Sequence, residues 1–78
     1  MNELINKMKT ALVGKNVWLG KFEWGTITDL EFNEKAENAR NFVAVFVDDS
    51  RLRFTKNEVE ALIDKGSFDL RVIEVYVR

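Results

Sequence analysis

Three aromatic side chains lie close together in the sequence, around one expected hairpin: Trp18, Phe22 and Trp24. Flat aromatic rings stack on nucleic-acid bases and grip extended peptides, so an exposed cluster of them would form a binding platform. The same side chains are large and apolar, and in a small domain they also serve to fill the core. Exposure of the two tryptophans would distinguish a binding surface from a core.

A second set of side chains carries positive charge. Arg51 and Arg53 alternate on one expected strand, which separates them by about 7 Å, close to the spacing of neighbouring phosphates on a single strand. With Lys21 and Lys56 they form a candidate nucleic-acid-binding stripe. The alternative is a solvated strand face on which each arginine pairs with a nearby carboxylate. The net charge of −1 excludes a globally basic protein, so any such site is local.

The residue types present argue against catalysis. The chain has no histidine and no cysteine, which removes the commonest general base and the thiolate nucleophile. It also has no glycine-rich phosphate loop. Asp29, Glu31, Glu34 and Glu37 form an acidic segment whose spacing differs from that of a calcium loop, so we expect a solvated loop. We therefore predict a protein that is not an enzyme and that has no metal or cofactor.

Length and composition predict one small domain over residues 1–78. Hydrophobic residues make up 46% of the chain, which is enough for a core. The longest apolar runs, such as Phe42 to Val47, are too short to span a bilayer, and the N-terminus lacks a secretory signal. The lack of cysteine agrees with a reducing compartment. We expect a cytoplasmic protein without membrane contact.

The first residues predict a helix over residues 2–13, within an N-terminal unit of residues 1–14. Asn2 is placed to cap its first turn, and Gly14 is placed to end it. The apolar side chains that recur at helical spacing are Leu4, Ile5, Met8 and Leu12. We expect this stripe to pack on the rest of the domain. The alternative is that it docks on a partner or on a second copy, which would give a weak homodimer.

Residues 15–78 predict a β-rich unit. Gly25 permits a sharp bend or bulge at the start of one strand, within the run Trp24-Gly25-Thr26-Ile27. In another strand apolar residues point to both faces, so it should be the most buried. In chain order we expect strands over residues 15–19, 24–32, 40–47, 51–54 and 68–77. The strand that we expect to be the most buried is 40–47.

Two connections carry clear local signals. Asp48-Asp49-Ser50 has the chemistry of a tight turn, because short polar side chains bond their own backbone and tolerate positive φ. Thr55 and Glu58 have the spacing of a capping box, which predicts a short helix ending at Gly66.

These elements predict a mainly β, small α+β domain. The best description is a five-stranded SH3-like barrel with an N-terminal helix and a short helix before the last strand, because closure removes exposed strand edges. The alternative is an open antiparallel sheet covered by the N-terminal helix.

Two runs resemble small Tudor-like and SH3-like domains, such as the C-terminal domain of UvrD-type helicases. Phe22 to Ile27 is similar to their "F-G-x-G-T-I" turn, and Val45 to Phe54 is similar to their "V-x-F-D-D-G" hairpin and following strand. Glu23 and Ser50 stand where that pattern has glycine. The resemblance covers Lys15 to Phe54 and implies a non-catalytic module that binds protein or nucleic acid.

Three functional hypotheses remain open. The first is an interaction module that binds a protein partner through Trp18, Phe22 and Trp24. The second is a nucleic-acid-binding accessory domain that uses the basic stripe together with the same aromatic side chains. The third is a structural subunit that self-associates through its N-terminal helix.

Overall fold

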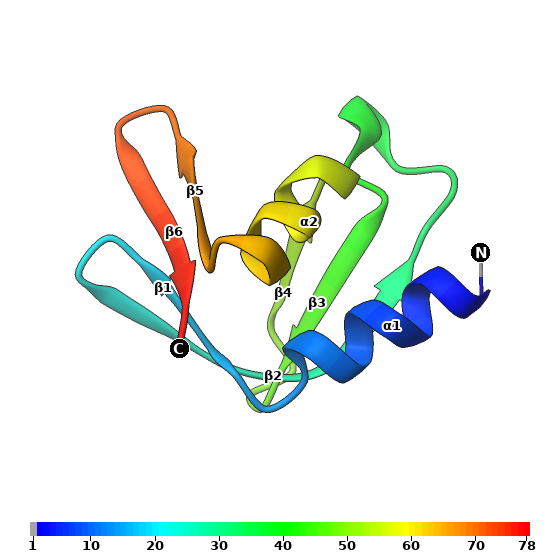
Figure 1. The fold of residues 1–78 in the computed structure, drawn as a ribbon, viewed down its shortest axis with the longest axis horizontal. Coiled ribbons are helices and arrows are strands. Elements are labelled where there is room, and N and C mark those ends of the chain that lie inside the picture. The colour runs from blue at the N-terminus through cyan, green and yellow to red at the C-terminus, as the bar shows by residue number, and fades with distance from the viewer. Residues whose placement is uncertain (1) are drawn as a thin grey trace.

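The computed structural model describes residues 2–78, with Asn2 described by its backbone alone (Figure 1). The predicted cap at Asn2 therefore lies outside the described side chains. The elements, in chain order, are α1 (Asn2–Leu12), β1 (Asn16–Leu19), β2 (Phe22–Phe32), a 3-10 turn (Glu37–Ala39), β3 (Phe42–Phe46), β4 (Arg51–Phe54), α2 (Lys56–Asp64), β5 (Ser67–Leu70) and β6 (Ile73–Val77).

Within residues 2–78, six strands form one antiparallel sheet in the order β4-β3-β2-β1-β6-β5. The prediction of a closed five-stranded barrel is therefore wrong, and the open antiparallel sheet that was its alternative is confirmed. The physical reason lies at Arg71, whose φ of 58° turns the chain back on itself. The expected last strand, residues 68–77, is consequently a hairpin, and β5 becomes an edge strand that β4 does not pair.

β2 is long enough to serve both halves of the sheet, since it pairs with β1 through its first residues and with β3 through its last. The register shifts between Val17 and Trp18 where Gly25 lies opposite, which confirms the bulge predicted beside this glycine. A second shift falls between Ile27 and Asp29. It brings Ile27 and Leu30 both into the core, although simple alternation places them on opposite faces.

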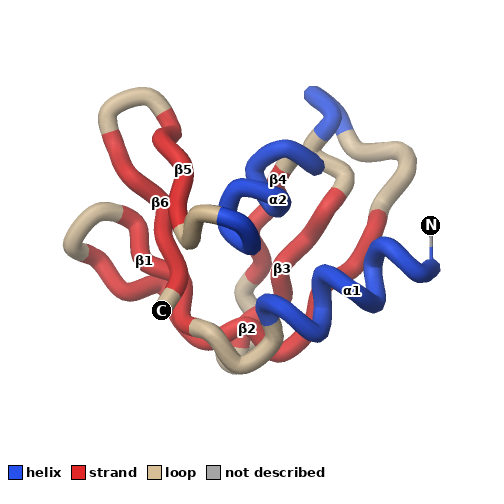
Figure 2. The backbone as a smooth tube through the Cα atoms, in the orientation of Figure 1, coloured by secondary structure: helices blue, strands red, loops and turns tan. Residues whose placement is uncertain are grey.

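The core lies between the sheet and the two helices (Figure 2). α1 contacts β2 and α2, and α2 contacts β5. Met8 and Leu12 of α1 are each 1% exposed, so the apolar stripe of α1 packs on the domain as predicted. The core side chains are Met8, Leu12, Val17, Ile27, Leu30, Phe42, Ala44, Phe46, Phe54, Val59, Leu62 and Val75. β3 supplies three of these and is the most buried strand, as predicted.

The predicted local signals are confirmed. Thr55 Oγ1 accepts a hydrogen bond from the Glu58 N–H at 3.1 Å, and Glu58 Oε1 accepts one from the Thr55 N–H at 2.9 Å, which completes the capping box. α2 ends at Asp64, and Gly66 follows the C-cap residue Lys65 with a φ of 79°, which suits glycine. At the β3–β4 turn the Ser50 N–H donates to Asp48 Oδ1 at 3.0 Å, and Asp49 has a φ of 67°.

Candidate interaction surface

The structure separates the three aromatic residues of the predicted platform. In the β1–β2 ladder Trp18 lies opposite Glu23, and Leu19 lies opposite Phe22. Because successive side chains of a strand point to opposite faces, Trp18 and Phe22 lie on opposite faces of the sheet. We call the face that carries the buried Val17 and the half-buried Leu19 the inner face, and the face that carries Trp18 the outer face.

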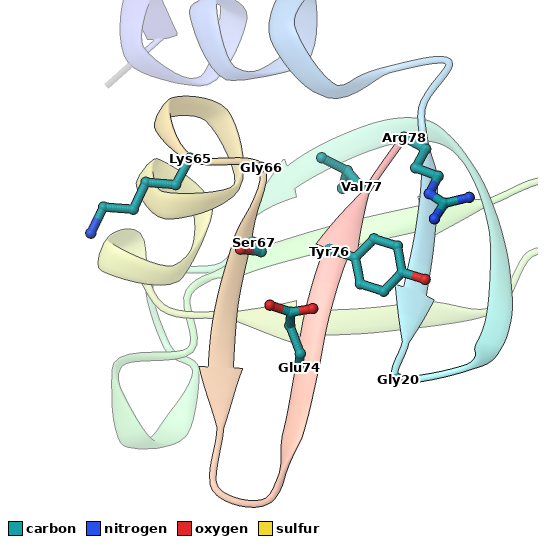
Figure 3. Close-up of a pocket in the computed structure, with 8 residues that line it drawn as sticks. All are labelled: Gly20, Lys65, Gly66, Ser67, Glu74, Tyr76, Val77 and Arg78. Carbon is teal, nitrogen blue, oxygen red and sulfur yellow. The ribbon is translucent and has the colours of Figure 1, made fainter.

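On the outer face Trp18 belongs to an aromatic stack with Tyr76. Their ring centroids are 6.0 Å apart with an interplanar angle of 8°. The Arg78 guanidinium lies over both rings, at 5.4 Å from the Trp18 centroid and 5.3 Å from that of Tyr76. Figure 3 shows Tyr76 and Arg78 on this face. Trp18 Nε1 is buried without a hydrogen-bond partner in the described chain. Trp18 is therefore engaged inside the molecule rather than presented as a free platform.

On the inner face Trp24 connects the core to the surface. Its ring makes edge contacts with Phe46 at 6.3 Å on one side and with Phe22 at 6.2 Å on the other. Its Nε1 donates to Ser50 Oγ at 3.1 Å, which ties β2 to the β3–β4 turn. Phe22 at the end of this chain of contacts is 62% exposed. Of the predicted trio, Phe22 is thus the side chain most available to a partner.

Phe22 shares the inner face with apolar residues of the β5–β6 hairpin. Leu19 lies opposite both Phe22 and Val75, and Ile73 follows two positions from Val75 on the same face. The β1–β2 and β5–β6 hairpins are joined by the pairing of β1 with β6 (Figure 1), and a Cβ on Gly20 would lie 3.3 Å from Ile73 Cγ1. We call the exposed apolar residues at the ends of these two hairpins the hairpin-tip surface; they are Phe22, Leu70, Val72 and Ile73.

Sequence reasoning missed three members of this surface because it assigned residues 68–77 to one continuous strand. Val72 is fully exposed, and Leu70 and Ile73 are 39% and 37% exposed. The charged Arg71 between two apolar residues was the available signal, but no glycine, proline or asparagine marks the turn.

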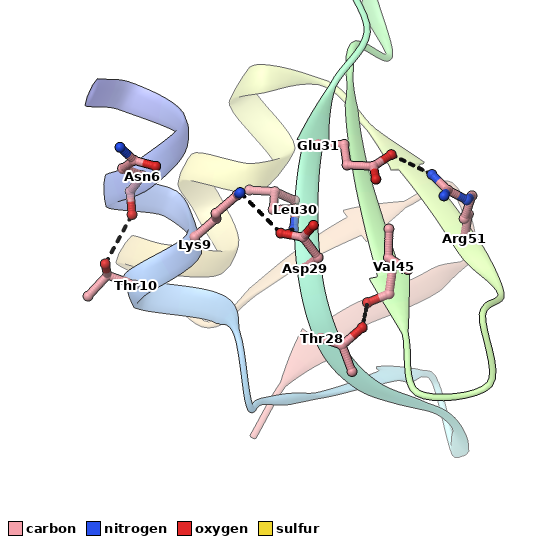
Figure 4. A network of polar contacts seen from close by, with 9 residues as sticks. All are labelled: Asn6, Lys9, Thr10, Thr28, Asp29, Leu30, Glu31, Val45 and Arg51. Carbon is pink, nitrogen blue, oxygen red and sulfur yellow. Dashed lines mark hydrogen bonds and ion pairs between the residues drawn. The ribbon is translucent and has the colours of Figure 1, made fainter. Parts of the chain in front are cut away.

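The predicted basic stripe is neutralised where it meets β2. Arg51 and Arg53 both point outward from β4 and are exposed, as predicted. Arg51, however, pairs with Glu31 at 2.5 Å, and Lys9 pairs with Asp29 at 3.2 Å (Figure 4). A hydrogen bond from the Leu30 N–H, together with Lys9, lowers the pKa of Asp29. Arg51 is therefore paired with a carboxylate of β2, whereas the Arg53 side chain belongs to no ion pair of the described chain.

Lys21 and Lys56 do not extend the stripe into one patch. Lys21 lies in the turn before β2. Arg51 of β4 and Asp29 of β2 both pair with Val45 of β3, so Arg51 lies at the same height in the sheet as Asp29. Asp29 follows Phe22 by seven positions along β2, which corresponds to about 23 Å of strand. Lys56 is exposed at the start of α2. The structure thus brings Arg51 and Arg53 together and leaves Lys21 apart.

The ion pair between Arg40 and Glu58 was not predicted from the sequence. The Arg40 guanidinium donates to both carboxylate oxygens of Glu58, at 2.6 and 3.2 Å, and to the Arg53 carbonyl oxygen at 3.2 Å. Arg40 therefore joins the loop before β3, the edge of β4 and the first turn of α2. Eighteen residues separate the two charged groups in sequence, so no local pattern indicates the contact.

Two hollows open on the surface of the described chain. A shallow depression of about 590 Å³ lies on the outer face, where Ser67, Glu74, Tyr76 and Arg78 border it (Figure 3). A groove of about 170 Å³ runs between α1 and α2. Within residues 2–78 no three carboxylate, histidine or cysteine side chains gather closely enough to hold a metal ion. Neither helix of that range is long and apolar enough to cross a membrane.

No protein-family model matches the chain, and no curated protein or solved structure is significantly similar to it. The resemblance of Lys15 to Phe54 to the C-terminal domain of UvrD-type helicases consequently stays a prediction.

Proposed function

We propose that the protein is a small, non-catalytic interaction module that binds a protein partner through the hairpin-tip surface. The observation that carries this proposal is the exposure of apolar side chains at the ends of two hairpins of one sheet, with Phe22 at 62% and Val72 fully exposed. Grouped apolar side chains on a small domain mark interaction sites, whereas scattered ones are ordinary. Both hairpins belong to one hydrogen-bonded sheet, so their ends are presented in a fixed arrangement.

The surface keeps one part of the predicted aromatic platform. Phe22 contributes directly, and Trp24 supports it from the core side through their edge contact. Trp18 lies on the other face, and in this proposal it stabilises the β1–β6 pair with Tyr76. A cytoplasmic location fits the absence of cysteine. The proposal also agrees with the non-catalytic module that the resemblance to UvrD-type C-terminal domains implies.

Nucleic-acid binding through Lys21, Arg51, Arg53 and Lys56 is the alternative function. The ion pair of Arg51 with Glu31 and the separation of Lys21 weaken it, since phosphate binding depends on grouped free cations. Self-association through α1 is the second alternative. Met8 and Leu12 are already used in the core, which leaves the half-buried Leu4 and Ile5 for a contact.

The test is a pull-down of tagged protein from its own cell lysate, with and without nuclease, read by mass spectrometry. The wild type is compared with the double variant Phe22→Ser, Val72→Ser and with Val47→Ser. Val47 is a matched control because it is 68% exposed and apolar but lies in the β3–β4 turn.

We expect the wild type to recover one protein in stoichiometric amount, with or without nuclease. The double variant should no longer recover this protein, whereas Val47→Ser should recover it as the wild type does. If nuclease treatment abolishes recovery of the partner, nucleic-acid binding would be the better-supported function. Recovery that is unchanged in the double variant would show that the hairpin-tip surface is not the binding site.

A further inference from the structure

The edge strand β5 carries backbone groups that no other strand uses. The Val77 N–H donates to the Gly66 carbonyl at 2.9 Å, so Gly66 and Val77 are a hydrogen-bonded pair of the antiparallel ladder. This pair fixes which later residues of β5 form hydrogen bonds with β6. In an antiparallel ladder bonded and non-bonded pairs alternate, so Phe68 and Leu70 bond toward β6. The N–H and C=O groups of Ser67 and Asp69 therefore point away from the sheet. They take part in none of the turn, loop or side-chain hydrogen bonds of the described chain.

The opposite edge of the sheet, β4, is protected by comparison. The Arg53 carbonyl, which points outward from β4, accepts a hydrogen bond from the Arg40 guanidinium. Arg40 is itself held by Glu58, so a fixed cationic side chain covers the end of that edge. Natural sheets commonly blunt an edge with such a charged group. In residues 2–78 no side chain forms a hydrogen bond with the backbone of Ser67 or Asp69 in β5.

The two faces beside β5 differ in chemistry. On the outer face Asp69 lies directly opposite Glu74 as a non-hydrogen-bonded pair, the arrangement in which side chains are closest. Both residues are exposed, and neither belongs to an ion pair of the described chain. Two like charges in this position repel each other unless a cation joins them. On the inner face Leu70, next to Ile73, continues the hairpin-tip surface up to the same edge.

We propose that β5 binds an extended segment of the protein partner, which adds to the sheet as a neighbouring strand. This inference rests on the proposed function and names how the partner meets the hairpin-tip surface. The segment has a Lys or Arg opposite Asp69, where its charge satisfies Asp69 and Glu74. Apolar residues flank that cation and extend over Leu70 on the inner face. Backbone hydrogen bonds supply the attachment, and alternate side chains supply the selectivity.

Charge favours such a basic partner over a second copy of the chain. Antiparallel pairing of two β5 strands about a twofold axis would keep the outer faces on the same side. It would gather Asp69 and Glu74 of both copies on one surface, which adds repulsion rather than relieving it.

The test is a selection of short peptides from a random-sequence display library on immobilised wild-type protein and on two variants. Asp69→Pro removes the outward N–H of β5 and leaves its ladder with β6 intact, because that N–H does not bond toward β6. Asp69→Lys keeps the backbone and reverses the charge. Glu34→Lys, in an exposed loop, is the matched charge control. Circular dichroism checks that each variant folds.

We expect peptides with a Lys or Arg flanked by apolar residues. Asp69→Pro and Asp69→Lys should each weaken their binding by about tenfold or more, whereas Glu34→Lys should not. Bound peptide should slow amide exchange at Ser67 and Asp69. If Asp69→Pro does not fold, Asp69→Lys and the exchange measurement decide the question.

Four outcomes would overturn the inference: no enrichment over the Asp69→Lys selection, enrichment of acidic peptides, unchanged exchange at β5, or a concentration-dependent dimer that Asp69→Pro abolishes. If the selected peptides no longer bind the double variant Phe22→Ser, Val72→Ser but still bind both Asp69 variants, only the inference of strand addition would be contradicted. The proposed function would survive that result.

Discussion

Phe46 and Phe22 show how differently two parts of one inner sheet face are treated. Both contact the ring of Trp24, yet Phe46 is 1% exposed and Phe22 is 62% exposed. Phe46 lies in β3, where side chains of α1 and α2 complete the core around it. Phe22 lies at the end of the β1–β2 hairpin, outside that core cluster. Apolar side chains therefore occur along the whole inner face, and packing of the helices determines which of them stay exposed.

The largest effect should separate these two phenylalanines. Phe46→Ala removes a fully buried ring and should lower the free energy of unfolding by about 3–5 kcal/mol, a large fraction of a small domain's stability. Phe22→Ala should cost about 1 kcal/mol or less, because its ring is mostly in water. Urea denaturation followed by tryptophan fluorescence measures both. Equal losses would show that the hairpin end is part of the core.

Loss of the ion pair between Arg40 and Glu58 should give the next largest effect. Glu58→Gln leaves the half-buried Arg40 without its bidentate partner and weakens the capping box of α2. We expect a loss of about 2 kcal/mol in the free energy of unfolding, measured by the same denaturation. Glu34→Gln, in an exposed loop, serves as the control and should change little. A Glu58→Gln variant as stable as the control would mean that the Arg40 contact contributes nothing.

Acid should weaken the folded state through two carboxylates, Asp29 and Asp48. Hydrogen bonds from the Ser50 hydroxyl and N–H lower the pKa of Asp48, and the Leu30 N–H and Lys9 lower that of Asp29. Each folded-state pKa lies below its unfolded value of about 3.9, so the folded state binds fewer protons. The stabilisation is therefore complete above about pH 5, and it is lost as the pH falls through the unfolded-state and then the folded-state pKa.

Denaturation midpoints between neutral and acidic pH measure this loss. The double variant Asp29→Asn, Asp48→Asn should show a shallower decline than the wild type. A variant whose midpoints fall in parallel with those of the wild type would place the acid sensitivity at other carboxylates.

The smallest effect should come from the hairpin that carries the exposed surface. Arg71 has a φ of 58°, a conformation that glycine adopts without steric cost. Arg71→Gly should raise the free energy of unfolding by about 0.5–1 kcal/mol, after the larger entropy of the unfolded glycine chain is subtracted. Thermal unfolding detects a gain of this size. A loss would indicate that the arginine side chain has a stabilising contact at the turn.

The parts of the fold that were predictable are those whose contacts are local. The capping box of Thr55 and Glu58 and the turn at Asp48 to Ser50 join residues at most a few positions apart. The closed barrel was predicted wrongly because a nonlocal choice decided it. β6 pairs with β1, and the turn at Arg71 leaves β5 at the edge instead of closing the sheet.

The candidate site was predictable only in part for the same reason. Phe22 was identified from its aromatic neighbours, but its exposure depends on where α1 and α2 pack. The grouping of Phe22 with Ile73 arises from pairing between β1 and β6, whose residues are distant in the sequence. The separation of Trp18 from Phe22 follows from strand register, which short-range patterns constrain only weakly.

The helices, the tight turn and the most buried strand could all be predicted from residues close together in the chain. Local hydrogen bonding and hydrophobic periodicity act within a few residues, so these features needed no tertiary information. The uncovered apolar side chains and the difference between the two sheet edges, β4 and β5, were not predictable in this way. Both depend on contacts between distant segments, as when Arg40 covers the β4 edge at Arg53 while the backbone groups of Asp69 in β5 stay unbonded.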